Sequence, residues 1–304
     1  MTLPKQVKIV EVSPRDGLQN ETTEIPTELK LQLIHALANS GLQDIEITSY
    51  VSPKWVPQLA DHHAVAKGVD LDSDTRYIAL VPNQHGLESA LQDGVKHIAV
   101  FTAASDRFSQ KNTNTSISES LNEIETVIKQ AQSYQLSIRG YISCVMACPY
   151  EGVTQPEKVA SIAKALFDMG CYEVSLGDTI GVGTPIQSKR LLEAVCKRVP
   201  MENLAVHFHD TYGQALANIY SALEEGISVV DSSVAGLGGC PYAPGAGGNV
   251  ATEDVLFLCQ GLGIKTGVDL EAVTQAGKVM TDHLGITPRS RAAIALQAAS
   301  YRKC

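Results

Sequence analysis

The fold of this 304-residue chain is constrained most by a regular alternation of strand-like and helix-like segments. Short apolar runs have the length and composition of buried strands, and they lie at residues 7–12, 44–48, 76–81, 97–102, 137–143, 172–177, 203–209 and 229–234. Helix-favouring stretches follow them at residues 27–39, 56–67, 83–92, 118–134, 156–169, 185–198, 213–225 and 252–262. Eight strand–helix units of roughly thirty residues predict a (β/α)8 barrel, the TIM-barrel fold of the α/β class.

Capping signals mark the ends of several of the predicted helices. Residues 116–119 and 154–157 have the spacing of a capping box, and Thr184 precedes a proline that suits the first helical turn. Glycines stand where a residue with positive φ would end a helix, at positions 41, 170 and 226. These local signals agree with the boundaries that the periodicity predicts.

Two further helical patterns follow the eighth unit, at residues 269–283 and 289–300, and we expect them to lie outside the barrel. The barrel itself would then span about residues 5–265. No low-complexity tract or linker interrupts the chain, so we predict one domain over residues 1–304. A doubly wound open sheet is the main alternative, because periodicity alone does not show that a sheet closes.

Charge and hydropathy exclude several classes of partner. The net charge of −9 argues against nucleic acid, and no apolar run is long enough for a membrane-spanning helix. A strand-like segment begins almost at the N-terminus, which leaves no room for a signal or transit peptide. The last residues, 301–304, do not resemble a peroxisomal Ser-Lys-Leu signal. Seven cysteines, an odd number, favour reduced thiols. We therefore expect a bacterial cytoplasmic protein.

A pair of histidines gives the clearest chemical signal. His207 and His209 are two residues apart at the end of an apolar run, so their side chains should point to the same face of a strand. Two imidazoles on one face can hold one divalent metal ion if oxygen ligands come from elsewhere. The alternative is a histidine pair that is satisfied by hydrogen bonds in the core.

Other polar residues lie in the predicted strands or just after them. Glu46 lies in the second strand, and the others follow strand ends, where the active site of this fold lies: Arg15, Asp16, Asp178, Cys240 and Asn249. Asp16 offers a carboxylate and Asn249 a carbonyl oxygen to complete the histidine site. Mixed nitrogen and oxygen ligands with open positions suit Mg²⁺ or Mn²⁺ better than structural zinc. Such an ion can lower the pKa of a bound hydroxyl group.

The remaining residues of this set suggest acid–base and electrostatic roles. Arg15 stays charged, so it suits the stabilisation of a developing oxyanion or enolate. Cys240 lies in a glycine-rich segment that could close over a substrate, and its thiol can exchange a proton near neutral pH; it can equally be a structural loop cysteine. Glu46 and Asp178 either hold Arg15 or a strand end in place, or transfer protons directly. Tyr141, which can face the barrel interior from the fifth predicted strand, is a weaker candidate.

Lys111 and Asn112 follow the fourth predicted strand, in a segment that we expect to be a loop. Their position could serve a phosphate group, but a solvated loop charge is the favoured interpretation. The glycine-rich residues 236–248 lack the strand–GxxxxGK[ST]–helix context of a phosphate-binding loop.

Several blocks of the chain resemble 3-hydroxy-3-methylglutaryl-CoA lyase. They cover nearly the whole chain in order and comprise residues 13–21, 48–58, 175–181, 207–214 and 236–242. The wider superfamily of metal-dependent barrels, which includes Claisen-type synthases and biotin-dependent carboxyltransferases, shares mainly the first-strand aspartate and the His-x-His pair. The segment around Cys240 separates this sequence from those enzymes. Gly247 stands where some relatives are expected to have serine, a difference that removes no ligand.

The resemblance implies a metal-assisted retro-Claisen cleavage of 3-hydroxy-3-methylglutaryl-CoA to acetyl-CoA and acetoacetate, in leucine degradation and ketone-body formation. It implies one Mg²⁺ or Mn²⁺ ion, an acyl-CoA substrate and a homodimer. Position by position, it assigns the metal ligands to Asp16, His207, His209 and Asn249. It assigns catalytic roles to Arg15 and Cys240 and supporting acidic roles to Glu46 and Asp178, while the identity of the general base stays open. Alternatives are a lyase for a longer branched 3-hydroxyglutaryl-CoA, a synthase of the same superfamily, and a non-catalytic metal-holding barrel.

Overall fold

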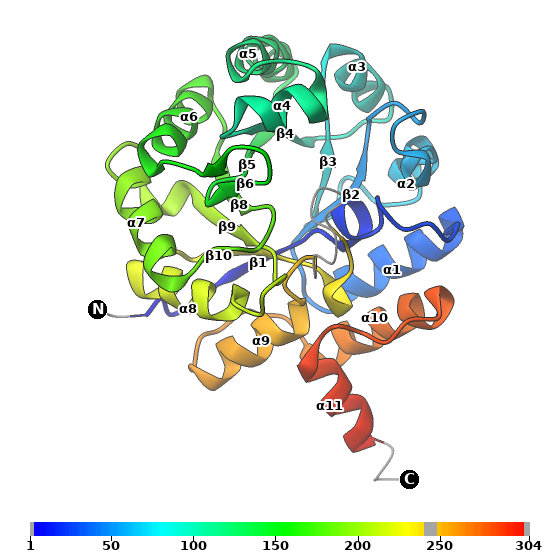
Figure 1. The fold of residues 1–304 in the computed structure, drawn as a ribbon. Helices are drawn as coiled ribbons and strands as arrows, with labels where there is room; N and C mark the ends of the chain where they lie inside the picture. The colour runs from blue at the N-terminus through cyan, green and yellow to red at the C-terminus, as the bar shows by residue number, and fades with distance from the viewer. Residues whose placement is uncertain (1–2, 240–247, 301–304) are drawn as a thin grey trace.

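The computed structural model describes residues 3–239 and 248–300. Its centre is a closed barrel of parallel strands in the order β1-β10-β9-β8-β5-β4-β3-β2 (Figure 1). The strands are β1 (Lys8–Glu11), β2 (Asp44–Ser49), β3 (Arg76–Leu80), β4 (His97–Ala103), β5 (Ser137–Ser143), β8 (Glu173–Asp178), β9 (Leu204–Phe208) and β10 (Val229–Ser232). The pairing of β1 with both β2 and β10 closes the sheet. The predicted barrel is therefore confirmed, and the open doubly wound sheet is excluded.

A ring of helices surrounds the barrel (Figure 1). The ring contains α1 (Thr27–Asn39), α2 (His62–Lys67), α3 (Gln84–Gln92), α5 (Ile117–Ser133), α6 (Pro156–Met169), α7 (Pro185–Val195), α8 (Ala215–Glu225) and α9 (Thr252–Gly261). Two helices follow it, α10 (Leu270–Leu284) and α11 (Arg291–Ser300). Helix α10 packs against α1, and α11 extends outward from the barrel. No helix in the described ranges is long and apolar enough to cross a membrane.

Helix boundaries follow the predicted caps in most places. The side chains of Ser116 and Glu119 form the expected capping box, and Thr184 forms another with Gln187. The capping box predicted at residues 154–157 is wrong. Helix α6 has no side-chain cap, because the Thr154 hydroxyl donates instead to the Cys144 carbonyl oxygen at 2.7 Å. The glycines at positions 41, 170 and 226 all have positive φ, as predicted.

The segment after β4 differs from the expectation of a loop. It forms helix α4 (Asp106–Thr113), whose first turn is capped by the Ser105 hydroxyl accepting a hydrogen bond from the Phe108 N–H. Lys111 therefore lies on a helix, where its ammonium group is 5.0 Å from the centre of the Tyr150 ring. A short hairpin of β6 (Ala147–Cys148) and β7 (Gly152–Val153) was also not predicted.

The two largest parts of the core differ in character. A large apolar cluster fills the space between the sheet and the helices. Inside the barrel a smaller apolar group, which includes Val10, Ile78 and Tyr141, is joined by buried charged residues on β5, β8 and β10. Barrel interiors of this fold are usually filled by bulky branched side chains. Buried charges must be paired with one another, so this interior is organised around a polar network that continues into the site.

Candidate metal centre

Arg15 and Asp16 lie on a single π-helical turn, η1 (Ser13–Gly17), directly after β1. The backbone N–H groups of Asp16 and Gly17 both donate to the Val12 carbonyl oxygen, at 2.7 and 3.2 Å. The glycine at position 17 lets this turn pack closely, because a Cβ there would lie 2.8 Å from the Ser233 hydroxyl oxygen and would force that side chain to shift. Isolated π-turns occur frequently at functional sites. Here the turn brings two consecutive charged side chains to the carboxyl end of the barrel.

The two histidines lie at the same end of the barrel. His207 is in β9, His209 follows the strand, and their ring centres are 5.4 Å apart. One potential ligand atom each from Asp16, His207 and His209 can be chosen so that all lie within 4.8 Å of one another. His207 Nε2 faces Asp16 Oδ2 at 3.9 Å. The prediction that these three residues form one cluster is confirmed.

The protonation states of this cluster suit a cation. Burial disfavours the charge on Asp16, but Arg15 and the two histidines outweigh it and hold the pKa of the carboxyl at about 2. Burial, with a contribution from His207, lowers the pKa of His209 to about 4. An ionised carboxylate and a neutral imidazole are the forms that bind a metal. His209 Nδ1 is also buried without a hydrogen-bond partner among the described residues, which is unusual for a buried polar atom.

Asn249 lies beside Asp16, as the ligand assignment requires, and is paired with His209 in an isolated β-bridge. Its side-chain nitrogen Nδ2 donates to Asp16 Oδ2 at 2.7 Å and to the Leu237 carbonyl oxygen at 3.3 Å. The amide nitrogen, not the carbonyl oxygen, therefore faces the carboxylate. The orientation of an amide is assigned from its hydrogen bonds, so a half-turn of the Asn249 side chain would present its oxygen to a cation at this place.

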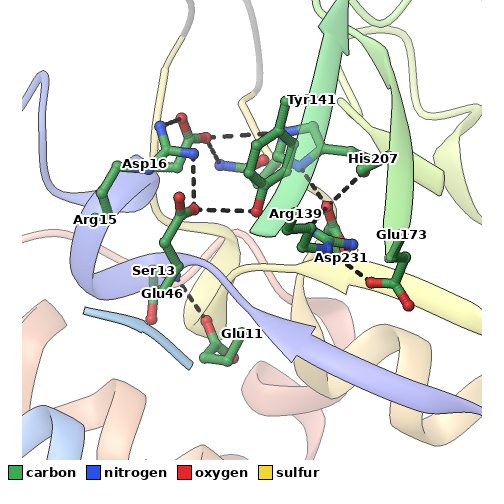
Figure 2. A network of polar contacts seen from close by, with 12 residues as sticks. Glu11, Ser13, Arg15, Asp16, Glu46, Arg139, Tyr141, Glu173, His207 and Asp231 are labelled. Carbon is green, nitrogen blue, oxygen red and sulfur yellow. Dashed lines mark hydrogen bonds and ion pairs between the residues drawn. The ribbon is translucent and has the colours of Figure 1, made fainter. Parts of the chain in front are cut away.

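Arg15 is held between two carboxylates. Its Nη1 donates to Asp16 Oδ1 at 2.6 Å and its Nη2 to Glu46 Oε2 at 2.7 Å (Figure 2). The Tyr141 hydroxyl also donates to Glu46 Oε2, at 3.3 Å. Burial opposes the charge on Arg15, but the neighbouring carboxylates raise its pKa above the usual range. Burial raises the pKa of Glu46 even though Arg15 opposes that shift. Among the two roles considered for Glu46, the geometry favours holding the guanidinium in place.

Asp178 ends β8 and is occupied by backbone groups. Its Oδ2 accepts from the Gly183 N–H at 2.7 Å and its Oδ1 from the Val182 N–H at 3.3 Å. These bonds hold the turn that follows the strand. Burial raises the pKa of Asp178 to about 6, although the backbone donors oppose the shift. A carboxyl with such a pKa can exchange a proton near neutral pH, so a structural role does not prevent a chemical one.

Cys240 lies outside the described residues. The described chain on either side of it comes together close to Asp16. A Cβ on Gly248 would lie 2.0 Å from the Gly238 carbonyl oxygen, and one on Gly238 would lie 2.8 Å from Asn249 Nδ2. Both glycines have positive φ, at 114° and 75° for Gly238 and Gly248. Only glycine allows this close approach.

Three charged residues that the sequence analysis did not select lie directly below the cluster: Arg139, Glu173 and Asp231 (Figure 2). Arg139 binds the Asp231 carboxylate with both terminal nitrogens, at 3.0 and 2.6 Å, and donates its Nε to Glu173 at 2.7 Å. His207 Nδ1 lies 3.3 Å from Asp231 Oδ2. The available signal was a charged residue inside an apolar strand, which the sequence analysis used for Glu46 but not for these three residues.

A closed parallel barrel that gathers a carboxylate, two imidazoles and a guanidinium at the carboxyl ends of its strands defines a metal-binding TIM-barrel enzyme. Residues 6–280 match the sequence model of the family described as HMGL-like. The chain therefore belongs to the HMGL-like family. The resemblance to 3-hydroxy-3-methylglutaryl-CoA lyase is confirmed by this match and by individual relatives.

One relative from Pseudomonas aeruginosa, 3-hydroxy-3-isohexenylglutaryl-CoA/hydroxy-methylglutaryl-CoA lyase, is 57% identical over 98% of this chain and 99% of its own. The crystal structure of a hydroxymethylglutaryl-CoA lyase from the same organism superposes with a TM-score of 0.96, with 57% identity over 98% of this chain and 100% of that chain. The structure of an HMG-CoA lyase from Acinetobacter baumannii, in complex with coenzyme A and 3-methylmalate, superposes with a TM-score of 0.92. The identity is 34%, and the match covers 97% of this chain and 96% of that chain.

Proposed function

We propose that this protein is a hydroxymethylglutaryl-CoA lyase that cleaves 3-hydroxy-3-methylglutaryl-CoA to acetyl-CoA and acetoacetate, a step in leucine degradation. The observation that carries the proposal is the Asp16–His207–His209 cluster with Arg15 hydrogen-bonded to its carboxylate. The 57% identity to a lyase over nearly the full length supports the choice of reaction. The complex of a relative with coenzyme A supports an acyl-CoA substrate.

The cation that we propose is Mg²⁺ or Mn²⁺, held by Asp16, His207 and His209, with the Asn249 oxygen as a fourth ligand after its amide turns. When bound, such an ion supplies Lewis acidity that lowers the pKa of the substrate's tertiary hydroxyl. The protein side chains then have three tasks: to accept the hydroxyl proton, to stabilise the carbanion equivalent that leaves, and to protonate it.

We assign the first task to Asp178, because its pKa of about 6 suits a general base near neutral pH. Loss of the hydroxyl proton lets the C3–O electrons form the ketone of acetoacetate while the C2–C3 pair becomes the enolate of acetyl-CoA. Arg15 stabilises the enolate oxygen, and Glu46 with Tyr141 holds its guanidinium in position. The Cys240 thiol donates the proton that converts the enolate into acetyl-CoA, an assignment that rests on the family resemblance.

The direct test is incubation of the protein with 3-hydroxy-3-methylglutaryl-CoA and Mg²⁺, with acetoacetate and acetyl-CoA measured as products. We expect the two products in equal amounts. The Asp16→Asn variant is the control, because it keeps the size of the side chain but weakens the cation site. Absence of product from folded, metal-loaded protein would rule out the proposed reaction.

A second candidate substrate is a longer branched 3-hydroxyglutaryl-CoA. The relative from Pseudomonas aeruginosa carries both activities in its name at 57% identity. The two substrates share the reacting carbons, so the same residues would act on both. The ratio of their kcat/KM values decides between them, since it reports the fit of the acyl chain alone.

We also propose that the protein is a homodimer and works in the bacterial cytoplasm. Five cysteines in the described part of the chain are free thiols, which suits a reducing compartment. Light scattering coupled to size-exclusion chromatography tests the dimer, which a mass of one chain would contradict.

A further inference from the structure

A cluster of buried charges crosses the barrel interior beneath the candidate metal centre. Arg139 is 0% exposed, Glu173 is 3% exposed and Asp231 is 1% exposed. Arg139 uses all three nitrogens of its guanidinium, two for Asp231 and one for Glu173. Burying such charges costs free energy even when they are paired, and a hydrophobic replacement is often no less stable. Stability alone therefore does not explain these buried charges, and the contacts that they make with residues outside the cluster indicate a further role.

One carboxylate oxygen of this cluster reaches the metal centre. Asp231 Oδ2 lies 3.3 Å from His207 Nδ1, and it also accepts hydrogen bonds from the Ser175 hydroxyl at 2.7 Å and from Arg139 at 3.0 Å (Figure 2). The other oxygen, Oδ1, is bound by Arg139 at 2.6 Å. With both oxygens engaged, the carboxylate cannot rotate. The imidazole that faces it is fixed in turn.

The fixed carboxylate determines which nitrogen of His207 carries the proton. An ionised carboxylate can only accept hydrogen bonds, so the facing Nδ1 must be the donor. In the neutral ring Nε2 then keeps its lone pair, and Nε2 lies 3.9 Å from Asp16 Oδ2. His209 differs, because its Nδ1 has no hydrogen-bond partner among the described residues. Of the two histidines, His207 is the one whose ring and tautomer are set by the barrel.

We propose that Asp231 is a positioning residue for metal binding: it accepts the Nδ1–H of His207 and thereby presents Nε2 to the cation, while Arg139 and Ser175 hold Asp231 itself. This inference rests on the metal site of the proposed function. Carboxylates that orient a metal-ligating histidine typically contribute about 10–100-fold to metal affinity. The buried cluster would then serve to orient a ligand of the metal.

The test compares Asp231→Asn with Glu173→Gln. Whichever way the amide introduced by Asp231→Asn turns, its nitrogen faces either His207 Nδ1 or a guanidinium nitrogen of Arg139. In the first case the hydrogen bond from His207 is lost, and in the second the acceptor of that bond loses its grip on Arg139, so in both cases the hold on His207 is weakened. Glu173→Gln removes one charge from the same buried cluster. Glu173 contacts Arg139 and Lys8, and the Lys8 side chain is 26% exposed and can move away. The pair therefore separates loss of buried charge from loss of the His207 contact.

Mn²⁺ affinity is measured by electron paramagnetic resonance of the free ion, with thermal unfolding of the metal-free proteins as a control. We expect Asp231→Asn to weaken Mn²⁺ binding by about 10–100-fold, and Glu173→Gln to stay close to wild type. Equal affinities for Asp231→Asn and wild type would overturn the inference, as would an equal loss in Glu173→Gln. Wild-type protein that binds no Mn²⁺ would instead refute the metal site of the proposed function.

A measurement on the wild type decides the matter if Asp231→Asn does not fold. Nitrogen-15 NMR of the histidine side chains distinguishes the two neutral tautomers. In the metal-free protein, at a pH where the imidazole is neutral, we expect His207 to be protonated at Nδ1 and unprotonated at Nε2. The opposite tautomer would contradict the hydrogen bond to Asp231 and with it the inference.

Discussion

The Arg15→Gln substitution tests two roles of one buried cation, its contribution to kcat and its contribution to the free energy of unfolding. The guanidinium donates to both Asp16 and Glu46 and is 6% exposed. Loss of a donor that stabilises a developing oxyanion typically lowers kcat by about 10²–10³, equivalent to about 2.7–4 kcal/mol. KM should change much less, because the interaction strengthens mainly as charge develops in the transition state.

The same substitution leaves Glu46 buried without its cation. Its remaining hydrogen-bond partner among the described residues is the Tyr141 hydroxyl at 3.3 Å. Breaking a buried ion pair in this way typically costs about 3–5 kcal/mol of unfolding free energy. The actual cost is limited because Glu46 can take up a proton. Burial already raises the pKa of this carboxyl, and the substitution removes Arg15, which opposes that shift.

The pH dependence of this cost has a definite sign. A carboxyl whose pKa is higher in the folded protein binds more protons there, so stability is lost as the pH rises above the unfolded pKa. Arg15→Gln raises the folded pKa of Glu46 further. The stability difference from wild type should therefore widen as the pH rises above the folded pKa of Glu46 in the wild type, by at most about 1.4 kcal/mol per pH unit.

Steady-state kinetics and urea unfolding at several pH values provide the assay. Arg15→Lys is the matched control that keeps the charge but loses the planar fork. The double variant Arg15→Gln/Glu46→Gln removes the unpaired carboxylate, so it should recover stability without recovering kcat. A steep rise in KM at constant kcat would make Arg15 a substrate-binding residue. A stability difference independent of pH would refute the role of Glu46.

The barrel could be predicted from the sequence because its signals are local. The apolar runs and the capping box at Ser116 lie within single elements, and β2, for example, was predicted at 44–48 and is found at Asp44–Ser49. Thr154 shows the limit of such signals. It has the spacing of a capping residue, but its hydroxyl donates a hydrogen bond to the Cys144 carbonyl oxygen instead. A local pattern cannot reveal that competing partner.

The cluster of metal ligands was equally accessible, because His207 and His209 need only the period of a strand to share a face. The Arg139–Asp231 pair was not, since its members are 92 positions apart and neither lies in a recognisable motif. The π-turn η1 also depends on distant contacts: the Glu11 carboxylate that accepts the Ser13 N–H also accepts the Val234 N–H, 223 positions away. The rule that active sites of this fold lie at the carboxyl ends of the strands selects the candidate ligands. It does not select the groups that orient those ligands.

The remaining predictions concern the metal, the base and the acid. Treatment with a chelator should abolish activity, and Mg²⁺ or Mn²⁺ should restore it; activity in fully metal-free protein would remove the ligand assignment. With Asp178 as the base, kcat/KM should fall as the pH drops through about 6, and an unchanged profile in Asp178→Asn would exclude it. Cys240→Ser should bind metal and substrate but turn over slowly, because the hydroxyl is far less acidic than the thiol. An alkylating reagent should inactivate the wild type chiefly through Cys240, and bound substrate should slow the reaction; four of the other cysteines, at positions 144, 148, 171 and 259, are buried and should react poorly. Wild-type turnover in Cys240→Ser would show that another group protonates the enolate.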